Sequence, residues 1–422
     1  MRTRSRARLF TLTTPLLVSL LSPALLVAQT VTGTLQGKAA DVGGGVLPGV
    51  TIAIVSTETG QERTLTTNER GFFSATFLPI GRYRVTASLS GFGSVLREKV
   101  EVTLNSTTVV DFTLDPKVSE QVRVTAEQPH IDTTDAEIKQ SLSAKQIEAK
   151  PTLTPGSFLS LAEVFTGFQE NPTSGQNNPT LSSGSSINFN GTGTRGATFQ
   201  INGINNDDAS ENQNRQGAAL STIKEFQVIT NNFSAEFGRG YGAVVLVQTK
   251  SGTNDLRGDA YVFYQNNSLN EKSYFARSQP KPENHRAEYG FTAGFPIIRD
   301  DLFGFVSLDR TERKGKTDYA RDLFLSSELA APRLTRGNDN PANRAFIDSI
   351  LARYPQGVTS NDPRSNRTYA TQINFNQPDE DYSGRLDWNA TASNQVTTRY
   401  QYTHQIREAD DVIVGEQAPQ NN

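Results

Sequence analysis

The chain has 422 residues, and its 41 lysines and arginines against 44 aspartates and glutamates give a formal net charge of −3. This length predicts two or three domains, and a nearly balanced charge provides no basic field to attract nucleic acid. With 35% hydrophobic residues and a mean hydropathy of −0.48, the chain is too polar for a bundle of membrane-spanning helices. Cysteine is absent and histidine occurs only three times, which excludes disulfides, thiolate nucleophiles and zinc–thiolate sites.

The first 28 residues have the layout of a secretory signal peptide. Four arginines lie within the first eight residues, and an apolar segment, Leu9 to Val27, is followed by the small residue Ala28. This order is typical of exported proteins. The alternative is a membrane anchor, but Pro15 and Pro23 interrupt the segment, and proline breaks helices. We therefore expect residues 1–28 to be a signal peptide cleaved near Ala28.

Residues 29–115 show the pattern of a small β domain. Apolar and polar residues alternate along 83–89, which is typical of a half-buried strand, and the alternation returns along 100–104 and 110–114. Turn sequences such as Leu47-Pro48-Gly49 separate these stretches about every ten residues. The spacing predicts a β-sandwich of about seven strands. It contains no cluster of acids, bases or nucleophiles.

The same region resembles a known module, the carboxypeptidase regulatory-like domain. The resemblance extends over the whole of 29–115 and is carried by Gly33, Leu47 to Val50, Thr59-Gly60, Gly71 to Phe73, Leu78 to Tyr83 and Gly91-Phe92. It implies an immunoglobulin-like accessory domain. Despite the name of that family, it implies no peptidase activity.

Residues 116–129 form a polar linker in which Val122, Val124 and Ala126 alternate with polar residues. One interpretation is an exposed linker that includes a last strand. The other is an extended peptide that pairs its backbone with the edge of a partner's sheet, where main-chain hydrogen bonds supply the affinity. The sequence leaves both interpretations open.

Residues 130–254 carry no motif of an enzyme class. One or two short helices are expected between 141 and 166, and Gly191 to Gly196 matches the glycine pattern of dinucleotide-binding proteins. That pattern needs a helix directly after the glycines to hold the pyrophosphate, whereas Ala197 to Ile204 predicts a strand and a turn. Serine-hydrolase, zinc-protease and phosphate-loop motifs are absent. We therefore expect no enzyme, no catalytic residue, no metal and no cofactor.

The second half of this region strongly resembles the plug domain of TonB-dependent outer-membrane receptors, specifically the Oar-like branch, which carries the sandwich module in front. The resemblance is carried by Ile201 to Ile204, Ile223 to Val228, Asn231 to Arg239 and Gly242 to Asn254. It implies an α+β plug domain over 130–254. It also implies that the linker holds the peptide pulled by TonB, the energy-transducing protein of the inner membrane: Gln121, Val122, Arg123, Val124, Thr125 and Ala126.

The loop that begins at Asn205 is rich in oxygen-bearing side chains. Asn205 to Asp208 has the ligand types that calcium prefers but not the spacing of a calcium loop, so we expect a solvated loop tip. In a plug domain this loop would lie at the apex. The resemblance therefore makes six residues candidates for contact with an external ligand: Asn205, Asn206, Asp207, Asp208, Asn212 and Asn214.

Residues 255–422 contain about five strand candidates with one apolar face. The alternation is clearest along 287–295, 382–390 and 396–402, and 261–265 and 303–309 add two more. A soluble antiparallel sheet with one wet face gives the same alternation as a membrane β-barrel. The signal peptide and the plug-like region before it favour the barrel, with 310–380 as a long polar loop.

The number of strands is too small for a closed, plugged barrel. Such barrels have about 22 strands, each about 9 to 11 residues long, but only 168 residues follow residue 254. We therefore expect an incomplete transmembrane antiparallel β-barrel, and a chain that is a fragment of a longer receptor. The expected fold class is mainly β, with a sandwich, an α+β plug and the first barrel strands.

The leading hypothesis is the N-terminal part of an outer-membrane receptor that takes up an unidentified external ligand. The barrel would contact outer-membrane lipid in a Gram-negative cell, with the plug and sandwich on the periplasmic side. The alternative is a structural or adhesive outer-membrane protein of the Oar type without uptake. A third hypothesis, a secreted enzyme with β-sandwich modules, has no motif to support it.

Overall fold

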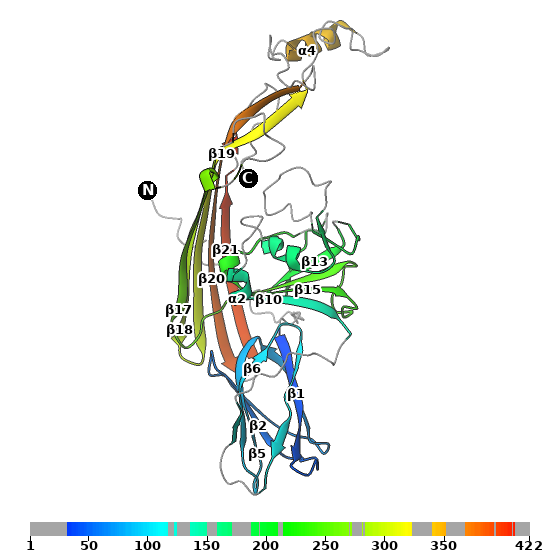
Figure 1. Ribbon diagram of the computed structural model, residues 1–422, viewed down its shortest axis with the longest axis vertical. Helices are drawn as coiled ribbons and strands as arrows, with labels where there is room; N and C mark the ends of the chain where they lie inside the picture. Colours follow the sequence, from blue (N-terminus) through cyan, green and yellow to red (C-terminus); the bar gives the residue numbers. More distant parts are fainter. Residues whose placement is uncertain are drawn as a thin grey trace, which may run out of the picture.

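The computed structural model contains three β units, which Figure 1 shows as a sandwich at one end, a central sheet above it and a long sheet beside the central one. Among the described residues, no helix is long and apolar enough to cross a membrane. The structure describes residues 32–116, 122–124, 136–149, 158–170, 187–193, 195–209, 214–269, 271, 281, 283–322, 340–351, 368–391, 394–406 and 408–409.

The first unit, hereafter the sandwich, packs two sheets face to face. One has the order β4-β1-β7 with β8 also paired to β1, and the other has the order β3-β2-β5-β6-β9. The bounds are β1 Thr32–Asp41, β2 Thr51–Ser56, β3 Glu62–Thr66, β4 Phe72–Pro79, β5 Gly81–Ser88, β6 Val95–Val102, β7 Thr107–Val109, β8 Phe112–Leu114 and β9 Val122–Val124.

The predicted alternation along 83–89 is confirmed. Tyr83, Val85 and Ala87 of β5 are buried, while Arg82 and Arg84 are exposed. The inward side chains of both sheets form one apolar core, which includes Leu35, Ile52, Ile54, Phe73, Val85 and Phe112. Burial of this face is what holds two such sheets together.

The second unit, hereafter the central sheet, has the strand order β10-β15-β16-β13-β14. β13 and β16 run parallel, and both are buried along their whole length, as expected for strands covered on two faces. Short helices pack on this sheet in the region where the sequence predicts them. The bounds are β10 Ile138–Ser143, α2 Ala144–Ala149, η1 Phe158–Val164, β11 Phe168–Glu170, β12 Ile187–Phe189, β13 Ala197–Ile201, β14 Ile204–Asn205, η4 Leu220–Thr222, β15 Ile223–Asn231 and β16 Ala243–Thr249.

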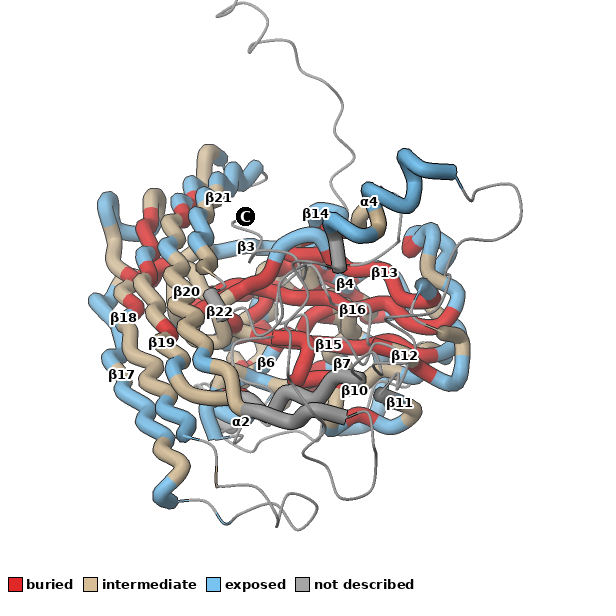
Figure 2. Tube along the Cα trace, turned by 90° about the horizontal axis from the view of Figure 1, so that it is seen from above, coloured by how far each residue is buried: buried red, intermediate tan, exposed pale blue. Residues whose placement is uncertain are grey.

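The third unit, hereafter the long sheet, is an antiparallel meander in the order β17-β18-β19-β20-β21, with β22 also paired to β20. Figure 2 shows it as a curved wall beside the buried strands of the central sheet. The sheet does not close on itself, as expected for an incomplete barrel. The bounds are β17 Arg257–Asn266, η5 Asn267–Leu269, β18 Asn284–Ile298, β19 Leu302–Asp322, α4 Pro341–Leu351, β20 Thr368–Thr391, β21 Asn394–Gln405 and β22 Glu408–Ala409.

The prediction of a loop over the whole of 310–380 is wrong. β19 continues to Asp322 and β20 begins at Thr368, so the two ends of the predicted loop are strand. The prediction followed the many charged residues of these ends, which are typical of a loop in solvent. Their charges pair across the strands instead, with Arg310 3.0 Å from Glu380 and Arg313 3.4 Å from Asp379.

The long sheet has its apolar face outward. In β20, Leu386 and Trp388 are each 48% exposed, while Arg385 and Asp387, which alternate with them, are buried. Tyr400 and Tyr402 of β21 are also exposed. A soluble sheet with one wet face would bury the apolar residues, so this inverted pattern favours the membrane alternative, in which strands present apolar side chains to lipid.

Candidate functional site

The candidate site is the set of polar contacts that join the central sheet to its two neighbours, together with the loop after β14. That loop starts from a tight hairpin. Asn202 and Gly203 both have positive φ, 52° and 75°, as a two-residue type I′ turn requires. The Asn202 side chain also bonds Thr249 at the end of β16, with its Nδ2 3.0 Å from the threonine Oγ1.

Asp207 fixes the loop from inside. It is buried, and its carboxylate accepts hydrogen bonds from the Thr198 hydroxyl at 2.5 Å, the Phe199 backbone N–H at 2.6 Å and the Asn205 amide at 2.9 Å. Three donors compensate a buried carboxylate for the loss of water. The role of this side chain in the structure is therefore to hold the loop on β13.

Asn206 holds the other side of the same loop. Its amide donates to the Asn214 side-chain oxygen at 2.5 Å and to the Gln216 carbonyl at 2.7 Å, and its own oxygen accepts from the Gln216 N–H. Asn206 and Asn214 are both buried. Asn205 is exposed and Asp208 is half-buried. The structure thus brings five of the six candidates into one loop, with three of them turned inward, while Asn212 lies outside the described residues.

Part of the proposed transducer-binding segment is a strand. Val122–Val124 forms β9, which pairs in parallel with β6 of the sandwich. The linker therefore contains a last strand, as one of the two interpretations required. Gln121, Thr125 and Ala126 lie outside the described residues.

The sandwich and the central sheet share a small apolar core. Leu104, in the turn after β6, is completely buried among residues of both units: Ile80, Ile229, Phe237, Val244 and Leu246. The backbone of Leu104 is bound from the central sheet on both sides. Its N–H donates to the two carboxylate oxygens of Glu225 at 3.2 and 3.1 Å, and its carbonyl accepts from the Gln227 amide at 2.8 Å.

Glu225 is buried in this interface, and the pKa of its carboxyl group is raised. Burial is the main cause that raises the pKa of its carboxyl to about 7, and nearby Glu101 raises it further. The Leu104 N–H and Lys224 act in the opposite direction and are weaker. A carboxyl group that titrates near neutral pH thus lies between the two units.

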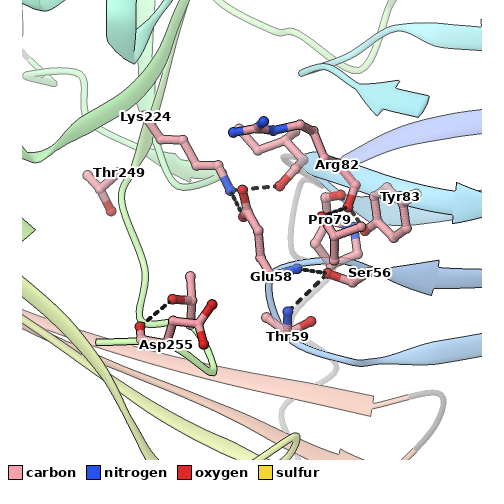
Figure 3. A network of polar contacts seen from close by, with 12 residues as sticks. Ser56, Glu58, Thr59, Pro79, Arg82, Tyr83, Lys224, Thr249 and Asp255 are labelled. Atoms are coloured by element: carbon pink, nitrogen blue, oxygen red, sulfur yellow. Dashed lines mark hydrogen bonds and ion pairs between the residues drawn. The ribbon is translucent and has the colours of Figure 1, made fainter. Parts of the chain in front are cut away.

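A second polar contact joins the same two units. Lys224 Nζ lies 2.8 Å from Glu58 Oε2 and donates to the Ile80 carbonyl at 3.0 Å. Figure 3 shows Lys224 pointing from the central sheet toward Glu58, in the turn after β2. The Glu58 carbonyl also accepts from the N–H of Asn254, which leads into the long sheet. A cavity of about 130 Å³ lies at this meeting point of the three units.

The central sheet contacts the polar face of the long sheet through a buried ion pair. Arg385 and Asp387 pair through two contacts of 2.8 Å, and Arg385 donates to the carbonyl and hydroxyl oxygens of Thr249, both at 3.0 Å. Thr397 also donates to Asp387. Two-point pairing satisfies both charges away from water.

Two further contacts lie along the same face. The Ser221 hydroxyl donates to Asp309 at 2.5 Å, and the Tyr261 hydroxyl donates to the same carboxylate oxygen. Gln401 donates to the Gly217 carbonyl at 3.0 Å. Besides β20, these contacts bond the central unit to two strands of the long sheet, β19 through Asp309 and β21 through Gln401.

The sequence analysis did not single out Arg385, Asp387 or Asp309 as functional residues. The signal was present, because Arg385 and Asp387 alternate with Leu386 and Trp388 in a strand that we assigned to a barrel. In such a strand, charged side chains point to the lumen. Among the described residues, no group of three or more His, Asp or Glu side chains is arranged to hold a metal ion.

Comparison with known proteins identifies both ends of the described chain. Residues 34–115 match the carboxypeptidase regulatory-like domain, and residues 248–421 match the outer membrane beta barrel domain. The TonB-dependent transporter Oar of Myxococcus xanthus is 25% identical over 272 residues, which cover 61% of this chain and 24% of Oar. The chain thus spans about a quarter of the length of that curated relative.

Solved structures with similarity include two receptors. The ferric enterobactin receptor of Pseudomonas aeruginosa is 14% identical, with 65% of this chain and 34% of that one covered and a TM-score of 0.39. The siderophore receptor PirA of Acinetobacter baumannii is 16% identical, with 64% and 32% covered and a TM-score of 0.37. At these scores the two similarities carry no argument about function.

Proposed function

This chain belongs with the Oar-like TonB-dependent outer-membrane receptors, and from that premise we propose that it serves the energised uptake of an external ligand. In this proposal 1–28 is a signal peptide and 29–115 the accessory sandwich. Residues 116–129 form the linker to the transducer, 130–254 the plug and 255–422 barrel strands. The plug and the sandwich lie on the periplasmic side. The chain acts as a receptor and transporter and not as an enzyme.

The observation that carries the proposal is the inverted long sheet with the central sheet bonded to its polar face. Leu386 and Trp388 point outward, whereas Arg385, which directly precedes Leu386, bonds Thr249 of the central sheet. This is the arrangement of a lumen closed from inside by a folded domain. A barrel blocked in this way admits a ligand only when the blocking domain moves, and pulling by the transducer supplies that movement.

The strand order supports a route for the pull. β10 follows the transducer-binding segment in the chain, lies at the edge of the central sheet and, among the described strands, pairs only with β15. Removing an edge strand from a sheet breaks the hydrogen bonds to one neighbouring strand. Removing β15 or β16 would break the hydrogen bonds to two neighbouring strands. We infer that pulling on 121–126 detaches β10 first and loosens the plug from this edge.

The loop after β14 is the proposed ligand contact. Among the candidate residues that the structure describes, Asn205 and Asp208 retain surface there, and Asn212 completes the set. Asn206, Asp207 and Asn214 are buried and serve by fixing the shape of the loop. The side chains present favour a polar ligand, and no single residue defines its class.

The decisive experiment is binding of the purified periplasmic domain of TonB to the full chain in outer-membrane vesicles. We expect binding by the unmodified chain and at least a tenfold loss when 121–126 is deleted. The matched control is deletion of the three linker residues Glu127 to Pro129, which lie outside 121–126. The adhesive alternative predicts no binding in any of these chains, together with a defect of surface attachment when the gene is removed.

A further inference from the structure

β9 is paired with the sandwich. Its three residues pair in register with β6, Val122 with Val95, Arg123 with Leu96 and Val124 with Arg97. β9 is the last strand of the sheet order β3-β2-β5-β6-β9, so β6 would form the edge without it. Part of the linker thus extends this sheet at its β6 edge.

This pairing uses the same backbone groups that a transducer would use. Strand addition to a sheet edge depends on main-chain N–H and C=O groups, and it is therefore tolerant of sequence. Bonds that β9 makes to β6 are not available to a second sheet at the same time. The two pairings therefore compete for this edge of β9.

The sandwich that holds β9 is itself fixed to the central sheet. Leu104 lies in the shared core, and Glu225 and Gln227 bind its backbone. Beside it, the Asn105 amide donates to Glu137 at 2.9 Å, and Lys139 of β10 donates to the Asn105 carbonyl at 2.7 Å.

The segment between β9 and β10 is therefore tied at both ends to one body. Val124 is paired with β6, and Glu137 is bonded to the turn after β6. While both ties hold, a pull applied to β9 is borne by the sandwich and does not reach β10. The pairing of β9 with β6 covers three of the described residues, and it is the weaker tie because the Leu104 contact includes a buried core.

We propose that the edge strand β6 of the sandwich is a holding site for β9, and that the transducer must take β9 from this edge before it can act on the central sheet. This inference rests on the proposed function, since it assumes that 121–126 is the segment the transducer binds. It assigns the accessory domain a role as competitor for that segment.

The chain contains no cysteine, so a disulfide tests the proposal without a background of other thiols. The double variant Arg97→Cys with Val124→Cys joins paired positions of β6 and β9. The matched control, Ala53→Cys with Thr64→Cys, joins paired positions of β2 and β3 away from β9. Binding of the purified TonB periplasmic domain to each full chain in outer-membrane vesicles is measured after oxidation and again after reduction.

We expect the oxidised β6–β9 variant to bind at least tenfold more weakly than its reduced form, with no change for the control pair. Equal binding in the oxidised and reduced forms would overturn the holding site and leave the proposed function intact. Absence of binding by the unmodified chain would overturn the proposed function itself.

A second pair, Leu96→Cys with Arg123→Cys, covers the case in which the first substitutions damage the segment. It joins the next paired position and is judged by the same two outcomes. Failure of both pairs to form a disulfide under oxidation would contradict the pairing of β9 with β6, because paired strands place such residues within disulfide range.

Discussion

Glu225 of the central sheet and Leu104 of the sandwich are joined by a hydrogen bond in which one backbone N–H is shared between two carboxylate oxygens, at 3.2 and 3.1 Å. The two residues are 121 positions apart in the chain. Because Leu104 is also completely buried in the shared core, this pair couples the position of the sandwich to that of the proposed plug.

The carboxyl group of Glu225 makes this coupling depend on pH. Its pKa is about 7 in the folded chain against an ordinary value of 4.5. A raised pKa means that the folded state holds the proton more tightly, so the contribution to stability is fully present below pH 4.5 and is lost as the pH rises through 7. The difference corresponds to about 3 kcal/mol.

We therefore predict that Glu225→Gln removes this pH dependence. The midpoint of thermal unfolding in detergent, measured from pH 5 to 8, should fall less with pH in this variant than in the unmodified chain. Glu69→Gln, at an exposed position of the sandwich, is the control and should follow the unmodified chain. Parallel curves for all three proteins would contradict the role of Glu225.

The ion pair between Lys224 and Glu58 should make a modest contribution to the same interface. A double-mutant cycle with Lys224→Met and Glu58→Gln should give a coupling free energy of about 1 kcal/mol, because both side chains are mostly but not fully buried. The exposed pair of Arg257 and Asp255 should give a value near zero in the same denaturant titration. A larger coupling for the exposed pair would be inconsistent with this reasoning.

Loss of Arg385 should loosen the central sheet from the long sheet. Arg385→Met leaves Asp387 buried without its cation, and breaking a buried pair in this way destabilises by about 3 to 5 kcal/mol. Arg385→Met with Asp387→Leu removes both charges and should recover most of the loss. Protease digestion of the detergent-solubilised chain measures access to the central sheet, and equal digestion of the single and double variants would count against this explanation.

The outward face of β20 should tolerate no charge in the membrane. Leu386→Arg places a cation where a lipid-facing residue is expected, with a cost of up to about 2 to 4 kcal/mol depending on depth. The amount of chain recovered in the outer-membrane fraction should fall. The same residue introduced by Glu69→Arg in the sandwich is the control. Normal recovery of the Leu386 variant would contradict lipid contact on this face.

The strands that could be predicted from the sequence are those with one apolar and one polar face. The alternating positions of Tyr83, Val85 and Ala87 predicted β5, and those of Leu386 and Trp388 predicted the apolar face of β20. The ends of β19 and β20 were missed because the charged residues that pair across them are also typical of a polar loop. A pair such as Arg313 and Asp379 spans 66 positions, and no local pattern reveals it.

The candidate site was predicted only in part, for a related reason. The loop from Asn205 to Asn214 was found by composition, but composition does not distinguish an exposed asparagine from a buried one that bonds its own loop. Glu225 and Gln227 alternate with buried apolar residues and resemble a solvent-facing edge in the sequence. They face the sandwich instead, and this contact depends on the tertiary fold, which the local sequence does not reveal.

The paired length of β19 and β20 has a mechanical consequence. The two strands stay in register from Leu302 opposite Trp388 to Asp322 opposite Thr368. At about 3.3 Å per residue, the 21 residues of β19 extend about 70 Å, more than twice the thickness of about 30 Å of a hydrocarbon layer. Even when the two strands are strongly tilted, their ends near Asp322 project beyond the bilayer. Whatever is attached near Asp322 is therefore held away from the lipid headgroups.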